Sequence, residues 1–104
     1  MDINQAKEKF IVKTRVEIGD EDYVVVREPT ESEIKGFGDD SQKNLEIIAE
    51  ILPECILEHS FTVDGKPAKN KEVAELVRSS VSLYTRFVKQ WMNDFVIDDK
   101  KKVN

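Results

Sequence analysis

Alternating apolar and polar residues near the start of the chain constrain its fold more than any other feature of the sequence. The side of this pattern expected to be buried consists of Phe10, Val12, Thr14, Val16 and Ile18. Residues 19–22 (GDED) supply a turn, and residues 23–27 (YVVVR) return as a second β-branched run. We therefore predict an antiparallel β-hairpin that begins near Lys9. Because a lone hairpin is marginal in water, the rest of the chain must cover its apolar face.

The segment that follows the hairpin carries the signals of a helix start. Pro29 ends the second strand, because it has no backbone N–H to give to a sheet. Thr30 and Glu33 stand at the spacing of a capping box, in which each side chain bonds to the backbone of the other residue. This spacing predicts a short helix that ends at Gly36 or Gly38.

A buried helix is predicted in the middle of the chain. Residues 39–41 offer an N-cap, and from Gln42 onward apolar side chains recur on one helical stripe: Leu45, Ile48, Ala49 and Leu52. Proline fits the first turn of a helix better than its interior. We therefore expect Pro53 to begin a new segment, with a separate turn or a kinked continuation over residues 54–59.

Two further helical patterns complete the chain. Residues 61–63 favour an extended segment and residues 64–67 a turn, after which Asn70 is the predicted N-cap of a helix. A break at residues 79–80 precedes the longest pattern, which runs from Ser80 to Phe95. Its apolar residues recur at spacings of three and four: Val81, Tyr84, Val88, Trp91 and Phe95. This pattern predicts a long amphipathic C-terminal helix.

Together these elements predict an α+β fold in which an N-terminal antiparallel β-hairpin packs against about four helices. The C-terminal helix is expected at the centre of the core. A chain of 104 residues has the common size of one domain, and we expect residues 1–97 to form a single compact domain. Residues 98–104 contain two acids, three lysines and one apolar residue, so we expect a disordered charged tail there.

Charge and composition argue against several classes of function. The chain carries 16 Lys+Arg and 21 Asp+Glu, and this net charge of −5 has the wrong sign for binding a phosphate backbone. Most of the acidity lies in residues 1–52, which contain 7 basic and 13 acidic side chains. No stretch approaches the roughly 18 apolar residues of a membrane span, and residues 1–10 lack the apolar core of a secretory signal. With Cys55 as its single cysteine, we expect a cytoplasmic protein that binds neither nucleic acid nor membrane.

Few residues have the chemistry of a catalytic or metal site. Cys55 and His59 stand four residues apart and would share one side of a helix, but the chain has no second Cys or His to complete a zinc site. The adjacent acids at 20–22 and 39–40 lie in predicted turns, where solvent leaves a carboxyl unperturbed. We therefore predict no catalytic residue, no metal and no cofactor. The protein is not expected to be an enzyme.

The C-terminal helical pattern offers the candidate partner contacts. Leu83 and Phe87 widen its apolar stripe beyond what a simple packing seam needs. Two interpretations are open: the stripe packs into the core, or part of it is left for another protein. For the second interpretation the candidate partner-binding residues are Leu83, Phe87, Trp91 and Phe95.

Four segments carry a resemblance to a known family. They are YVVVRE at 23–28 running into PTESE at 29–33, IIAEILPECI at 47–56, DGKPA at 64–68, and the helix with Trp91. Their order, over about residues 10–95, resembles that of the tail assembly chaperones of tailed phages and prophages. The resemblance implies a non-catalytic protein of the bacterial host cytoplasm. Such a protein binds and solubilises the tape-measure protein during tail assembly, helps to recruit tail-tube protein, and is absent from the finished virion.

Two other classes of function are open on the same residues. A small structural virion component, such as a head-tail connector or tail-terminator subunit, would share the size and the α+β pattern and would form a fixed ring in isolation. An acidic regulatory or inhibitor protein would suit the net charge of −5, with its acids clustered on one folded face. Self-association is compatible with each class.

Overall fold

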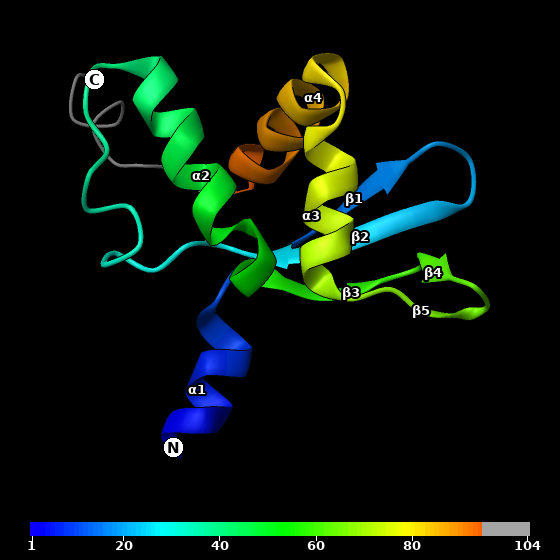
Figure 1. Cartoon of the computed structure of the whole chain (residues 1–104). Helices are drawn as coiled ribbons and strands as arrows, with labels where there is room; N and C mark the ends of the chain where they lie inside the picture. The colour runs from blue at the N-terminus through cyan, green and yellow to red at the C-terminus, as the bar shows by residue number, and fades with distance from the viewer. Residues whose placement is uncertain (95–104) are drawn as a thin grey trace.

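The structure, a computed structural model of the chain, describes residues 1–94 (Figure 1). Among these residues it contains a three-stranded antiparallel sheet, a two-stranded sheet and four helices, which confirms the predicted α+β class. The elements in chain order are α1 (Ile3–Phe10), β1 (Lys13–Ile18), β2 (Asp22–Arg27), α2 (Ser41–Cys55), β3 (Ile56–His59), β4 (Thr62–Val63), β5 (Lys66–Pro67), α3 (Asn70–Arg78) and α4 (Val81–Asn93). Phe95, the predicted domain boundary at 97 and the predicted tail at 98–104 lie outside the described residues.

The predicted hairpin is present as strands β1 and β2. They pair from Lys13 opposite Arg27 to Ile18 opposite Asp22. Gly19 has a φ of 74°, a left-handed conformation that glycine adopts without steric cost, and it begins the turn. A third strand, β3, pairs antiparallel with β2 on its other side, giving the order β1-β2-β3.

The segment around Pro53 differs from its prediction. Pro53 lies inside α2, which continues to Cys55, and the next four residues form strand β3 instead of a helical turn. Because Pro53 stands in the last turn of α2, the helix loses one backbone hydrogen bond and continues past it. Strand β3 exists because its backbone pairs with β2, a tertiary contact that residue spacing along one segment does not reveal.

The short helix predicted after Pro29 is also wrong, although its capping box forms. The Thr30 N–H donates to Glu33 Oε1 at 2.8 Å, and the Glu33 N–H donates to Thr30 Oγ1 at 3.2 Å. Residues 31–36 form turns, because only isolated backbone hydrogen bonds follow the box and the segment then reaches two glycines. The capping residues fix a loop here.

Helices α3 and α4 begin close to their predicted starts. Asn70 is the first residue of α3 instead of its N-cap, and its side chain donates to the carbonyls of Pro53 and Ile56 at 3.2 and 2.9 Å. The predicted break lies between the helices, where Ser80 Oγ accepts from the Leu83 N–H at 3.2 Å. Within the described residues α4 spans 13 residues, and α2, with 15, is longer.

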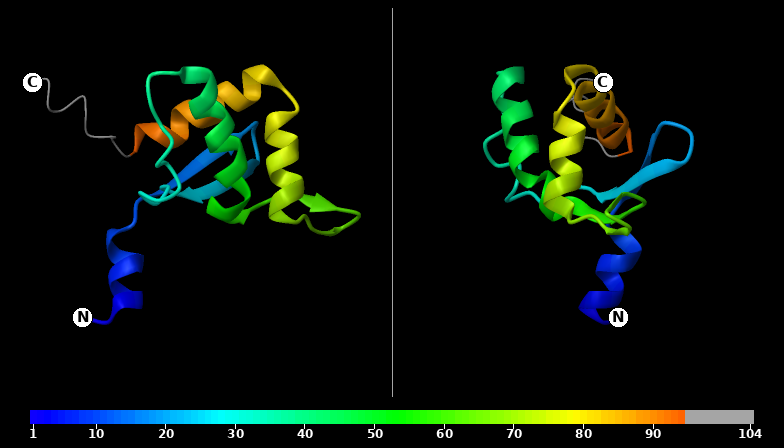
Figure 2. Two further views of the ribbon diagram at one scale, coloured as in Figure 1. Left: turned by 60° about the vertical axis from the view of Figure 1, so that its left-hand side comes forward. Right: turned by 45° about the vertical axis from the view of Figure 1, so that its right-hand side comes forward.

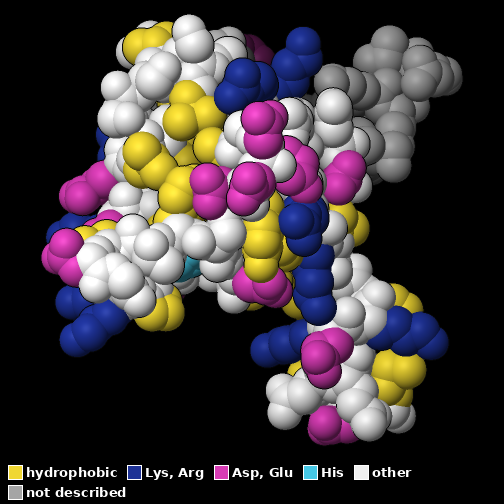
Figure 3. Space-filling model, turned by 90° about the vertical axis from the view of Figure 1, so that its right-hand side faces the viewer, with side chains coloured by type: hydrophobic (Ala, Val, Ile, Leu, Met, Phe, Trp, Pro, Cys, Tyr) yellow, Lys and Arg dark blue, Asp and Glu magenta, His cyan; other side chains and the backbone are white. Residues whose placement is uncertain are grey.

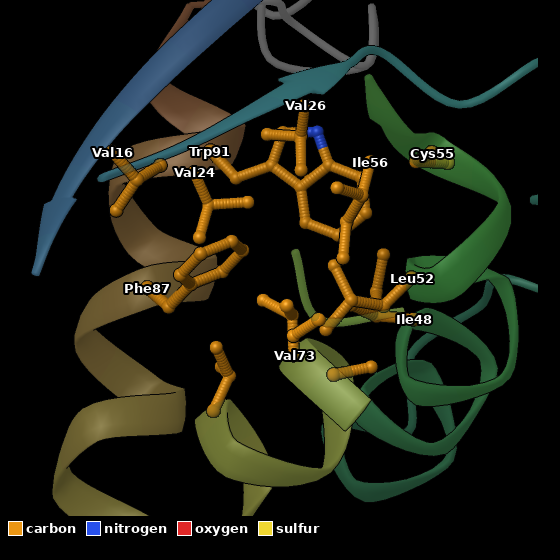
Figure 4. Packing of buried hydrophobic residues seen from close by; sticks show 13 residues of the cluster. Val16, Val24, Val26, Ile48, Leu52, Cys55, Ile56, Val73, Phe87 and Trp91 are labelled. Atoms are coloured by element: carbon orange, nitrogen blue, oxygen red, sulfur yellow. The ribbon is translucent and has the colours of Figure 1, made fainter. Parts of the chain in front are cut away.

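Helices α2, α3 and α4 lie on one side of the three-stranded sheet (Figure 2). Buried hydrophobic side chains from the sheet and these helices form one core cluster. Figure 4 shows Trp91 and Phe87 pointing from α4 toward Val24 and Val26 of β2. The two rings meet edge to face, with centroids 6.2 Å apart. The Trp91 indole N–H donates to the Arg27 carbonyl at 3.0 Å, so its one polar atom is satisfied inside the core.

Helix α1 was not predicted, and it corrects the expectation that the first element is a strand from Lys9. The pairing with β2 ends where the Val12 carbonyl accepts from the Glu28 N–H at 2.8 Å, because the next N–H that could face this strand, that of Thr30, donates to Glu33 Oε1 instead. Residues 3–10 (INQAKEKF) contain good helix formers and fold into α1 instead. None of its residues is buried, and Figures 1 and 2 show it projecting away from the body.

Candidate protein-binding surface

The structure places two of the predicted partner contacts in the core. Phe87 and Trp91 are 1% and 0% exposed, so in the folded chain neither ring reaches the surface. Leu83 is half-buried, and Phe95 lies outside the described residues. Phe87 and Trp91 therefore pack into the core, because the sheet needs a large apolar cover and these two rings supply it.

Cys55 and His59 do not share the side of a helix. Cys55 ends α2 and is completely buried, and burial raises the pKa of its thiol to about 12, which keeps it protonated and a poor nucleophile. His59 lies on β3, where its Nδ1 accepts from the Phe61 N–H at 3.1 Å and its Nε2 lies 2.8 Å from the Ala68 carbonyl oxygen. Both ring nitrogens therefore contact backbone groups on either side of the β4–β5 hairpin, those of Phe61 and Ala68, and fix its position.

An ion pair fixes the loop between β2 and α2. The Arg27 guanidinium donates two hydrogen bonds to the Glu33 carboxylate, at 2.9 and 3.0 Å. Together with the Thr30 N–H, it lowers the pKa of Glu33 to about 2. A carboxylate held ionised in this way is no proton donor near neutral pH, so its role is to anchor the turns at 31–36 to the sheet.

Beyond this anchored loop, α2, α4 and Phe37 enclose an open groove of about 280 Å³, which we call the α2–α4 groove. Its apolar lining residues are Phe37, Leu45, Ile48, Val88 and Met92, and its polar ones are Ser41 and Asn44. Among the described residues that line it, none carries a charge. Such a surface suits an apolar ligand face and offers little to a charged small molecule.

Hydrogen bonds hold the walls of the α2–α4 groove in place. The Tyr84 hydroxyl of α4 donates to the Leu45 carbonyl of α2 at 2.7 Å, which sets the spacing of the two helices. Asn44 bonds twice to the backbone of Gly38, at 3.1 and 2.9 Å, and so positions the neighbouring Phe37. The groove is therefore preformed, and a ligand that enters it does not have to order its walls.

Helix α1 is the second exposed apolar feature. Ile3 and Phe10 are 71% and 66% exposed, and Figure 3 shows hydrophobic and charged side chains mixed on this projection at the lower right. An open hollow of about 280 Å³ lies between α1 and the face of the sheet turned away from the helices. Its lining residues are Lys7, Glu8, Ile11, Lys13, Arg27 and Leu57.

The sequence contained partial signals for both features. The spacing of Ile3, Ala6 and Phe10 places one apolar stripe on a helix, but a segment of eight residues is short for a pattern-based prediction. Val88 and Met92 stand four residues apart on α4, and only the tertiary structure brings them next to Phe37.

Comparisons with known proteins give no relative. No protein-family model, no curated protein and no solved structure matches this chain. Within residues 1–94, no three or more His, Cys, Asp or Glu side chains come together as a group that could hold a metal ion. No helix in that part of the chain has both the length and the apolar character that crossing a membrane requires.

Proposed function

We propose that this chain is a non-catalytic protein-binding module that takes the apolar side of an amphipathic client helix into the α2–α4 groove. The observation that carries this proposal is a preformed, uncharged apolar groove whose walls are fixed by hydrogen bonds. Grooves of this kind accept helices that present apolar residues at spacings of three and four. The client thereby hides apolar surface that would otherwise cause it to aggregate.

In the cell, the function we propose is that of a tail assembly chaperone in the cytoplasm of a bacterial host. The resemblance of segments 23–33 and 47–56 supports this proposal, and the client would be the long helical tape-measure protein. One groove covers only a short stretch of helix, so many copies would be needed along a long client. The acidic charge of each copy, net −5, would keep such a coated client soluble.

The proposal is tested by co-expression with the long helical protein encoded by a neighbouring gene. We expect the client to remain soluble and to co-purify with this chain. Leu45→Asp places a charge in the groove at a side chain that is already 37% exposed, and it should abolish co-purification. Leu57→Asp, on β3 and 50% exposed, is the matched control outside the groove and should leave co-purification unchanged.

Either of two results would overturn the proposal. Equal co-purification with both variants would show that the groove is not used. Absence of any client, together with a stable ring in light scattering, would instead favour a structural virion component.

A further inference from the structure

Helix α1 presents an apolar stripe that stays largely exposed within the part of the chain that the structure describes. Ile3 and Phe10 lie on the same side of the helix as Ala6, and no residue of α1 is buried. An isolated helix of eight residues is unstable in water, because its few hydrogen bonds do not offset the cost of nucleation. The helix therefore needs a surface to pack against.

The chain's own α2–α4 groove is out of reach of α1. Only Ile11 and Val12 link α1 to β1, and Val12 is held on both sides by Glu28, through bonds of 2.9 and 2.8 Å. The hollow beside α1 includes Lys13 and Leu57, which alternate with the buried residues of their strands and so face away from the helices. The groove lies on the helix-covered side of the sheet.

We propose that α1 of a second copy of this chain fills the α2–α4 groove, and that two copies exchange their α1 helices reciprocally to form a closed dimer. Both surfaces that meet are apolar: the stripe of Ile3 and Phe10 on one copy, and the uncharged lining of the groove on the other. Charges at the margins also match, because Lys7 flanks the stripe while Asp39 and Asp40 precede Ser41 at the end of the groove.

The area available explains why the exchange is reciprocal. An α1 of 8 residues is about 12 Å long, and one such helix in a groove buries about 500 Å² in total, a value typical of weak contacts. Two symmetric exchanges bury about 1,000 Å², near the lower limit for a specific interface. An interface this small is typical of weak complexes, so the dimer is expected to dissociate on dilution.

This inference does not rest on the proposed function. The dimer would cover the groove whether or not another protein also binds there. If a client helix does use the groove, it competes with α1, and client binding separates the two copies. The two proposals can fail independently, because one is measured with the purified chain alone and the other with the client present.

The first test is sedimentation velocity of the full chain from about 1 μM to about 1 mM, the range in which small interfaces dissociate. We expect the mass to rise from monomer to dimer with concentration. Phe10→Asp should remain a monomer throughout, and its fold should be intact because Phe10 is 66% exposed and contributes nothing to the core. Gln5→Asp adds the same charge on the other side of α1 and should dimerise like the parent chain.

A second test locates the contact. A thiol-reactive nitroxide modifies a Gln5→Cys variant only at the new cysteine, because Cys55 is completely buried. This copy is mixed with a parent copy that carries no nitroxide and has isotope-labelled methyl groups. Broadening of the Leu45, Val88 and Met92 methyl signals supports the exchange. A parent chain that stays monomeric at every concentration, or broadening only away from the groove, overturns it. The proposal would also be overturned if the parent chain were a monomer and deletion of residues 95–104 shifted these methyl signals. That result would mean that the chain's own C-terminal segment occupies the groove.

Discussion

A single carboxylate, that of Glu33, holds the loop ahead of α2 to the sheet. Its pKa is lowered to about 2 from an ordinary value of 4.5, chiefly by the Arg27 guanidinium and also by the Thr30 N–H. A carboxyl whose pKa is lowered by folding stabilises the folded state when it is ionised. This stabilisation is therefore fully present above about pH 5 and is lost as the pH falls toward about 2.

We expect Glu33→Gln to lower the free energy of unfolding at pH 7 by about 1–2 kcal/mol, since solvent at the edge of the pair screens part of the interaction. The difference from the parent chain should shrink as the pH is lowered from about 5 to about 2. Urea unfolding at a series of pH values measures both effects. Glu31→Gln, at an exposed position of the same loop, is the control and should change little. A difference that does not vary with pH would contradict the assigned role of the ion pair.

At the level of whole elements, the sequence pattern predicted the strands and helices whose formation depends on residue spacing within one segment. The β-branched alternation predicted the hairpin, and the apolar spacing predicted the bodies of α2, α3 and α4, because each of these elements buries one regular face. Strand β3 was not predicted, because it forms by pairing with β2, a segment distant in the sequence. The α2–α4 groove was not predicted for the same reason, since Phe37 and Met92 meet only after the chain folds.

The spacing of α2 and α4 depends on the Tyr84 hydroxyl, which donates to the Leu45 carbonyl at 2.7 Å. We expect Tyr84→Phe to lower the free energy of unfolding by about 1 kcal/mol, the usual net value of one hydrogen bond in a half-buried site. Tyr23→Phe removes a bond of 2.6 Å to Glu58 on the exposed face of the sheet and should lower the free energy of unfolding by less, because water replaces that bond. Thermal or urea unfolding compares the two variants, and equal losses would argue that Tyr84 does not set the helix spacing.

Across the whole of the described molecule, residues 1–94, stability is divided between a body with one hydrophobic core and a helix outside it. The cluster around Trp91 joins the three-stranded sheet to α2, α3 and α4, so these elements are expected to open only by global unfolding. Helix α1 contributes no side chain to that cluster. The free energy that protects α1 in a monomer is therefore close to zero, whereas the body is protected by the full free energy of unfolding.

Hydrogen exchange read by mass spectrometry measures this division directly. At low micromolar concentration the amides of α1 should exchange at nearly the rate of an unstructured peptide, while those of β2 and α4 remain protected. Raising the concentration should protect α1 and, in the same range, the residues of the groove, because the exchanged helix gains its stability from the apolar contacts of the second copy. Phe10→Asp should leave α1 unprotected at every concentration, since its stripe can no longer enter an uncharged groove. Protection of α1 that is already complete at the lowest concentration would mean that the helix packs within its own chain, and the exchange between copies would have to be abandoned.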